Sequence, residues 1–189
     1  TDILATGDSG AFAIAACHND NSVIRKIILV NPPDIKELSN IPDKRSKIFM
    51  NLLQLPIVGT FIYNLFTGRN STDELFTEYY FYNSNLLEHD LISTYYETAH
   101  MDANSKYLFA SIYGHYTTVN LKHCLKTITN SIYFIVGDDK MNKTENIDIY
   151  RNIMPSIEVE TIHETRQLPQ LEKPNEFMDK VKIFLEDEF

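Results

Sequence analysis

The sequence predicts an α/β protein built on a parallel sheet, and three short apolar runs carry this prediction. They are Ile3 to Ala5, Lys26 to Asn31 and Ser131 to Gly137. Runs that are short, continuously apolar and rich in β-branched residues are typical of strands buried on both faces of a parallel sheet. A fourth segment, Ile157 to His163, alternates apolar and polar residues as a strand nearer the sheet edge does. Helix-like segments lie between these runs, so the strands are expected to be flanked by helices.

A long region without strand patterns divides the chain into two expected parts. Residues 34–129 contain amphipathic segments separated by Pro, Gly and Asn-Ser breaks, which predicts a helical insertion. Residues 1–33 and 130–189 are then expected to form the sheet domain. The insertion is rich in aromatic residues, such as Tyr79 to Tyr82. We interpret these as helix packing, with the wall of an apolar substrate pocket as the alternative.

Composition excludes several classes of partner and compartment. The 189-residue chain has a formal net charge of -9, which argues against nucleic acid or an anionic membrane as partner. Polar residues, Pro56 and Gly59 interrupt the longest apolar region, Ile48 to Phe66, so no membrane span is expected. Nothing in the first residues resembles a signal peptide, and Cys17 and Cys124 lie far apart. A cytoplasmic protein with reduced thiols is therefore expected.

The segment Thr6 to Ala11 follows the first apolar run and leads into a helix-like stretch. Strand, glycine turn, serine and helix form the layout of a nucleophile elbow, G-x-S-x-G. Here Gly7 and Ser9 match the pattern, and Ala11 stands where the second glycine is usual. This spacing makes Ser9 the candidate nucleophile and the Gly10 N–H a candidate oxyanion donor.

Four blocks come in the order found in α/β-hydrolases, and the chain resembles that superfamily from the nucleophile elbow onward. They are Gly7 to Ala11, Ile28 to Pro32, Phe134 to Asp139 and Leu168 to Phe177, the last of which resembles the ending G-H-x-P-x-x-E-x-P-x-x-F. The resemblance implies an α/β-hydrolase fold whose helical insertion is a cap. It also implies that the early strands lie outside this sequence, so the missing N-terminal half is itself an expected partner.

The resemblance also assigns the remaining catalytic positions, and this chain departs from them. Gln167 stands where the family has its histidine base, and an amide cannot take a proton from Ser9. Lys140 stands at the usual position of the acid, which leaves Asp138 or Asp139 as the candidate acid, with Asp34 as another position that some members use. His163 is a candidate substitute base, and a strand-end histidine facing solvent is the alternative.

Three hypotheses of function follow. The first is a serine hydrolase that acts through Ser9 on a small, fairly apolar ester or amide. The second is a non-catalytic pseudo-hydrolase that binds a small apolar ligand or a partner. The third is a GDSL-type hydrolase, since Gly7-Asp8-Ser9 matches the first block of that family, although only Glu160 to His163 stands where its D-x-x-H is expected. No cofactor is expected, and no residues with the spacing of metal ligands are present.

Overall fold

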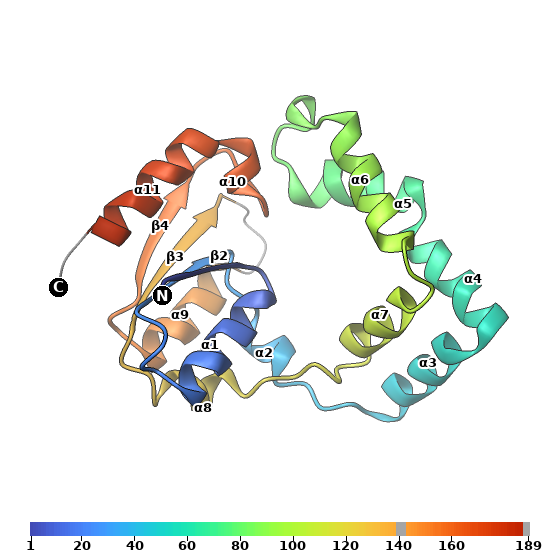
Figure 1. The fold of residues 1–189 in the computed structure, drawn as a ribbon, viewed down its shortest axis with the longest axis horizontal. Coiled ribbons are helices and arrows are strands. Elements are labelled where there is room, and N and C mark those ends of the chain that lie inside the picture. The colour runs from blue at the N-terminus through green and yellow to red at the C-terminus, as the bar shows by residue number, and fades with distance from the viewer. Residues whose placement is uncertain (139–142, 187–189) are drawn as a thin grey trace. The chain divides into compact units, whose positions relative to one another are not determined.

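The computed structural model describes residues 1–138 and 143–186, and within them a four-stranded sheet carries the fold. The strands are β1 (Ile3–Thr6), β2 (Lys26–Val30), β3 (Ser131–Gly137) and β4 (Glu158–Ile162). They lie in the order β1-β2-β3-β4, and every neighbouring pair is parallel (Figure 1). The predicted parallel sheet is thus confirmed.

Helices cover both faces of this sheet, because the side chains of β2 alternate between two apolar clusters. Ile27 and Leu29 belong to the larger cluster, and Ile28 and Val30 to the smaller one. The helices of the sheet unit are α1 (Ser9–Asn19), α2 (Ile35–Leu38), α8 (Leu121–Leu125), α9 (Lys143–Ile153), α10 (Pro169–Glu172) and α11 (Pro174–Glu186).

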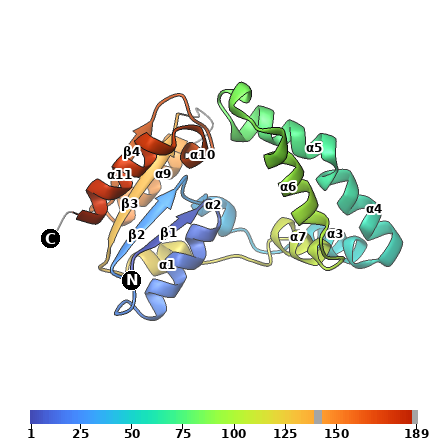
Figure 2. The ribbon, with the colours of Figure 1, turned by 45° about the horizontal axis from the view of Figure 1, so that its top comes forward.

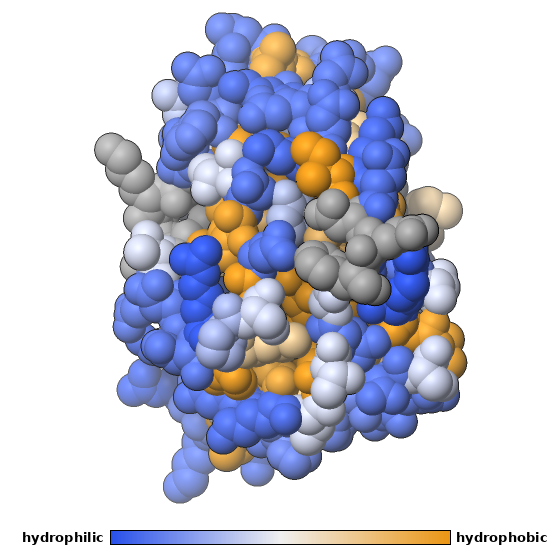
Figure 3. Space-filling view, turned by 90° about the vertical axis from the view of Figure 1, so that its left-hand side faces the viewer, coloured by the Kyte–Doolittle hydropathy of each residue, from blue (hydrophilic) through white to orange (hydrophobic). Residues whose placement is uncertain are grey.

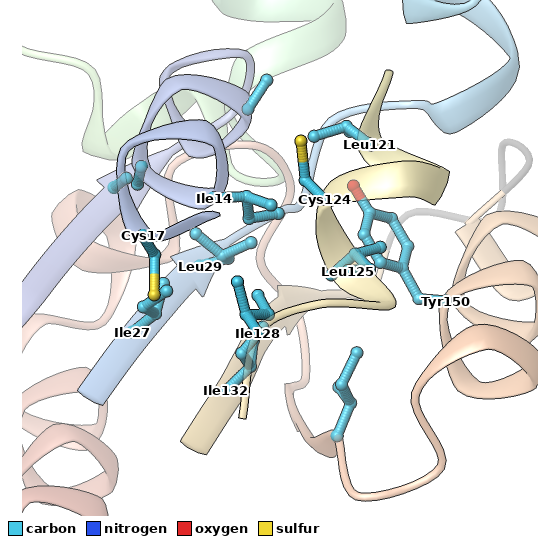
Figure 4. Packing of buried hydrophobic residues seen from close by; sticks show 14 of the residues in the cluster. Ile14, Cys17, Ile27, Leu29, Leu121, Cys124, Leu125, Ile128, Ile132 and Tyr150 are labelled. Atoms are coloured by element: carbon cyan, nitrogen blue, oxygen red, sulfur yellow. The ribbon is translucent and has the colours of Figure 1, made fainter. Parts of the chain in front are cut away.

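The larger cluster lies between the sheet and the helices α1, α8 and α9 (Figure 4). Ile14 and Cys17 of α1 point toward Ile27 and Leu29 of β2, and all four are completely buried. Tyr150 of α9 is also buried, and its hydroxyl donates to the carbonyl oxygen of Pro33 at 2.9 Å. This contact connects α9 to the segment that follows β2, at the edge of the sheet where the candidate site lies.

On the opposite face, α11 supplies an apolar stripe. Phe177, Val181 and Phe184 are buried against the sheet. The ring of Phe184 stacks on Tyr133 of β3 at a centroid distance of 4.6 Å. The ammonium of Lys26, at the start of β2, donates to the carbonyl oxygen of Phe184 at 2.6 Å, which explains how a lysine is tolerated in a buried position.

The second compact unit, residues 40–118, is entirely helical in Figures 1 and 2. It contains α3 (Lys44–Gln54), α4 (Pro56–Thr67), α5 (Arg69–Glu74), the π-helix η1 (Leu75–Tyr80), the 3₁₀-helix η2 (Ser84–Leu86), α6 (His89–His100) and α7 (Ser105–Tyr113). One of its buried clusters is formed by Leu53, Tyr63 and Ala110, and Phe76 and Phe81 are buried as well. The unit is shorter than the expected insertion of residues 34–129, because α2 and α8 pack with the sheet unit.

Some apolar surface of the sheet unit is left uncovered. Figure 3 looks from the left-hand side of Figure 1 and shows hydrophobic residues in the middle of the face with hydrophilic residues around them. Strand β1 lies at the sheet edge, where Leu4 is 47% exposed, and Phe12 on the following helix is exposed as well.

No single helix among the described residues is long and apolar enough to cross a bilayer, although α3 and the stretch Pro56–Tyr80 pass that test together as a pair bent by 106°.

Candidate active site

The carboxyl ends of the four parallel strands meet at one edge of the sheet, and every candidate residue in the sheet unit follows one of them. Ser9 follows β1, Asp34 follows β2, Asp138 follows β3, and the segment 163–167 follows β4. Ligands of open parallel α/β sheets bind outside this edge. The sheet topology therefore supports placing the candidate site here.

The turn after β1 is sharp, and Gly7 is the residue that makes it so. Its φ of 55° lies in the left-handed region, which glycine adopts without the steric cost that other residues meet. Its N–H donates to Val30 of β2 at 2.9 Å, and its carbonyl oxygen accepts from Gly10 at 3.0 Å, so the turn is held at both ends. A Cβ placed on Gly7 would meet nothing within 4 Å. The sharpest point of the elbow thus faces open space and carries no side chain.

Ser9 lies beyond this point, as the first residue of α1. Its hydroxyl donates to the carbonyl oxygen of Thr6 at 2.7 Å and accepts from the Thr6 N–H at 3.0 Å. The single proton of the hydroxyl is therefore directed at the backbone of β1. A base could take this proton only after the bond to Thr6 had opened.

Gly10 brings α1 close to the sheet. Its Cα is buried, and an added Cβ would lie 3.1 Å from Leu29 and 3.2 Å from Pro33. Its N–H, the expected oxyanion donor, donates to the carbonyl oxygen of Gly7. In this arrangement the Gly10 N–H stabilises the turn.

Two candidates predicted from separate segments, Asp138 and His163, are brought together. Nδ1 of His163 lies 3.3 Å from one carboxylate oxygen of Asp138, and the N–H of Glu164 donates to the other oxygen at 3.3 Å. Both side chains are largely exposed, the histidine at 76%. Histidine oriented by a carboxylate is the pair that a general base requires. Asp139 and Lys140 lie outside the described residues.

Gln167 lies in the loop after β4, and Asn31 holds its backbone in place. The side-chain NH₂ of Asn31 donates to the backbone carbonyl oxygens of Arg166 at 3.1 Å and of Gln167 at 2.9 Å. Its side-chain oxygen, Oδ1, accepts from the Gly137 N–H at 3.1 Å. Asn31, directly after β2, thus contacts the last residue of β3 and the loop that follows β4. It is buried and has a φ of 47°, in the left-handed region.

Sequence reasoning missed the role of Asn31, although one signal was present. Asn31 is a polar residue at the end of a completely buried apolar strand, directly before two prolines. A buried amide in such a position needs partners. The partners are backbone groups of segments more than a hundred residues away, so the sequence alone does not name them.

Other candidates serve the fold locally. Asp34 caps α2, since its carboxylate accepts from the N–H groups of Lys36 and Glu37. Glu172, from the family-like ending, is buried and accepts from the Arg166 N–H at 2.7 Å. This contact anchors the loop that carries Gln167. Within the described residues no group of three or more His, Cys, Asp or Glu side chains could hold a metal ion.

Solved structures similar to this one are enzymes with a common fold. A bromoperoxidase from Bacillus anthracis matches 98% of this chain with a TM-score of 0.71 at 12% identity. A 2-hydroxy-6-oxo-6-phenylhexa-2,4-dienoate hydrolase from Rhodococcus matches 99% with a TM-score of 0.70 at 10% identity. A serine hydrolase from Cycloclasticus zankles matches 98% with a TM-score of 0.68 at 15% identity. The chain has the α/β-hydrolase fold.

The chain spans 67% of the bromoperoxidase, 64% of the Rhodococcus hydrolase and 63% of the Cycloclasticus hydrolase. No protein-family model and no curated protein sequence matches it. The likeness at these identities concerns the fold. What the site does must be argued from its own residues.

Proposed function

We propose that this chain belongs to a protein that uses the α/β-hydrolase fold to bind a small apolar ligand without serine-dependent catalysis. The observation that carries the proposal is the elbow itself. Gly7 occupies the sharp point where a nucleophile elbow presents its side chain, and it has none. Ser9 is two residues further on, and its hydroxyl is bonded to the backbone of Thr6.

The base position supports the same proposal. Gln167, which the resemblance places there, has no nitrogen that takes up a proton near neutral pH. Loss of a nucleophile or a base lowers kcat by roughly 10⁴ to 10⁶ in serine hydrolases. A site that lacks both can still bind a ligand, and the carboxyl edge of a parallel sheet is where such folds bind small molecules.

A second candidate function is favoured by the pairing of His163 with Asp138. In this alternative Ser9 is the nucleophile, His163 replaces the missing base, and Asp138 orients it. The substrate would be a small, fairly apolar ester or amide. This candidate requires the hydroxyl of Ser9 to leave Thr6 and the loop after β4 to bring His163 to it.

A fluorophosphonate probe separates the two candidates, because it labels only serines activated as nucleophiles. The purified protein is incubated with the probe and the modified residue is located by mass spectrometry, with Ser9→Ala as the control. The binding proposal expects no label. Label on Ser9 that His163→Ala abolishes would overturn it in favour of the hydrolase.

A positive assay for binding completes the test. The protein is titrated with a panel of small aromatic and aliphatic esters while chemical shifts or intrinsic tyrosine fluorescence are followed. Saturable binding with no hydrolysis of the bound ester is the expected result. Absence of both binding and label would count against both candidate functions.

A further inference from the structure

The helices α3 and α4 of the helical unit each expose a stripe of apolar residues. In α4, Ile57, Phe61 and Leu65 recur every four residues and are 84%, 70% and 63% exposed. Residues at this spacing lie on one side of a helix. In α3, Ile48 and Leu52 are likewise spaced by four and exposed. The core of the unit uses other positions of the same helices, Leu53 and Tyr63.

A basic cluster lies at the start of the first of these two helices. No charged residue occurs from Ile48 to Gly68. Exposed Lys44, Arg45 and Lys47 precede the uncharged run, and exposed Arg69 follows it. Asp43 lies next to this cluster, where its carboxylate caps α3, and exposed Asp73 and Glu74 follow Arg69 in α5. The excess of positive charge at the start of α3 contrasts with the net charge of -9 for the whole chain.

An apolar helix face bordered by lysine and arginine fits the interfacial region of an anionic bilayer, where apolar side chains enter the acyl boundary and cations meet the phosphates. A second copy of this chain would bring identical cations together, which disfavours self-association through the same face. Among the described residues no single helix is long and apolar enough for a span, and α3 passes that test only together with Pro56–Tyr80, at a bend of 106°.

We propose that the exposed apolar stripes of α3 (Ile48 and Leu52) and α4 (Ile57, Phe61 and Leu65), together with the basic residues beside them in the sequence, bind the surface of an anionic lipid bilayer without crossing it. Apolar burial supplies the affinity, and Lys44, Arg45, Lys47 and Arg69 supply the preference for anionic lipid. The preference should weaken as salt is added, because salt screens the exposed charges.

Vesicle co-sedimentation tests the proposal with the purified protein. One set of vesicles contains phosphatidylcholine alone, and a second set contains phosphatidylcholine mixed with phosphatidylglycerol. The expected result is sedimentation with the mixed vesicles and little with the neutral ones. Equal binding to both sets, or binding to neither, would overturn the proposal.

Two variants and one matched control identify the binding surface. The first variant replaces three apolar residues of α4 and should lower the partition coefficient at least tenfold: Ile57→Ser, Phe61→Ser and Leu65→Ser. The second removes three cations and should lower the partition coefficient on anionic vesicles on the order of a hundredfold: Lys44→Gln, Arg45→Gln and Lys47→Gln. Met101→Ser, at an equally exposed position of the same unit, should leave it unchanged. Circular dichroism verifies that each variant is folded.

If these apolar residues instead bound a second copy of this chain, the result would be different. Size-exclusion chromatography without lipid would then show a dimer that the α4 triple variant abolishes, and this outcome would overturn the proposal. Loss of vesicle binding in both variants, together with an unchanged elution volume, would support it.

Discussion

The hydroxyl of Ser9 is bonded twice to the backbone of Thr6, once as donor at 2.7 Å and once as acceptor at 3.0 Å. These bonds connect the first turn of α1 to the last residue of β1, on either side of the turn at Gly7. Ser9 is therefore well suited to hold the elbow closed.

Replacement of Ser9 should for this reason affect stability. Ser9→Ala removes both bonds to Thr6 and should lower the free energy of unfolding by about 1 kcal/mol. Urea denaturation followed by circular dichroism measures the change. The exposed Ser22 is a matched serine away from the elbow, bonded only to Asp20 within its own turn. A loss for Ser9→Ala no greater than for Ser22→Ala would contradict a structural role.

If Gly7 and Gln167 stand at the nucleophile and base positions, the missing groups can be supplied there. Combined Gly7→Ser and Gln167→His should create an esterase activity on a small ester such as 4-nitrophenyl acetate. The double variant should exceed Gly7→Ser alone by roughly a hundredfold, the usual contribution of a positioned general base. Fluorophosphonate labelling at position 7 is the direct readout.

The substitution at Gly7 has a cost that can be measured separately. A φ of 55° disfavours a side chain by about 1–2 kcal/mol, although the space around the position is open. Gly7→Ala should show this loss without activity. A folded double variant that takes up label at Ser9 instead would mean that the positions are assigned wrongly.

Much of the fold follows from local sequence patterns. The four strands and their parallel arrangement were predictable, because burial on two faces gives continuous apolar runs. The site was less predictable. The motif G-x-S-x-G can be matched at Gly7 to Ala11, whereas the left-handed φ at Gly7, which marks the sharp point of the turn, is a property of the folded backbone.

The pair formed by Asp138 and His163 shows the same limit. Each residue could be found from its place after a strand, but their distance of 3.3 Å depends on the pairing of β3 with β4. The role of Asn31 depends on the end of β3 and the loop after β4, both of which are distant from it in sequence. Contacts of this kind come from the sheet topology and leave only a weak local signal.

Asn31 should be the most sensitive polar residue of the sheet unit. Asn31→Gly removes its side-chain bonds to Arg166, Gln167 and Gly137 and should lower the free energy of unfolding by about 3 kcal/mol, since buried backbone groups lose their partners. Asn31→Ala should lose about 1 kcal/mol more, because alanine tolerates the left-handed φ less well than glycine. Thermal or urea unfolding measures both, with exposed Asn152→Ala as the control. Equal stability of the Gly and Ala variants would argue against the backbone part of this prediction.

The two thiols should be unreactive in the folded protein. Cys17 and Cys124 are free and buried, and burial raises the pKa of each thiol above its ordinary value. Less thiolate is then present at mildly alkaline pH, and access is restricted. Ellman's reagent should modify both thiols rapidly in urea and only slowly in buffer. Fast reaction in buffer would contradict the burial of these side chains.

The same raised pKa values imply a pH dependence with a definite sign. Because the folded pKa exceeds the unfolded one, the stabilising contribution is complete below the unfolded pKa and is lost as the pH rises toward the folded pKa. Combined Cys17→Ala and Cys124→Ala should therefore flatten the fall in stability at alkaline pH. If the stability of wild type and variant fell with the same slope at alkaline pH, the fall would have to come from other titrating groups.

Strand β1 should make the purified 189-residue chain self-associate. Within the described residues β1 pairs only with β2, and Leu4 is exposed on this edge strand. Unpaired edges with apolar side chains are templates for pairing with another chain. Size-exclusion chromatography should show species larger than the 21.9 kDa monomer, and Leu4→Lys should shift them toward the monomer, because a charge on an edge strand opposes pairing. The control Ile183→Lys, on the exposed side of α11, should leave the elution volume unchanged. A sharp monomer peak of the wild type at micromolar concentration would refute the prediction.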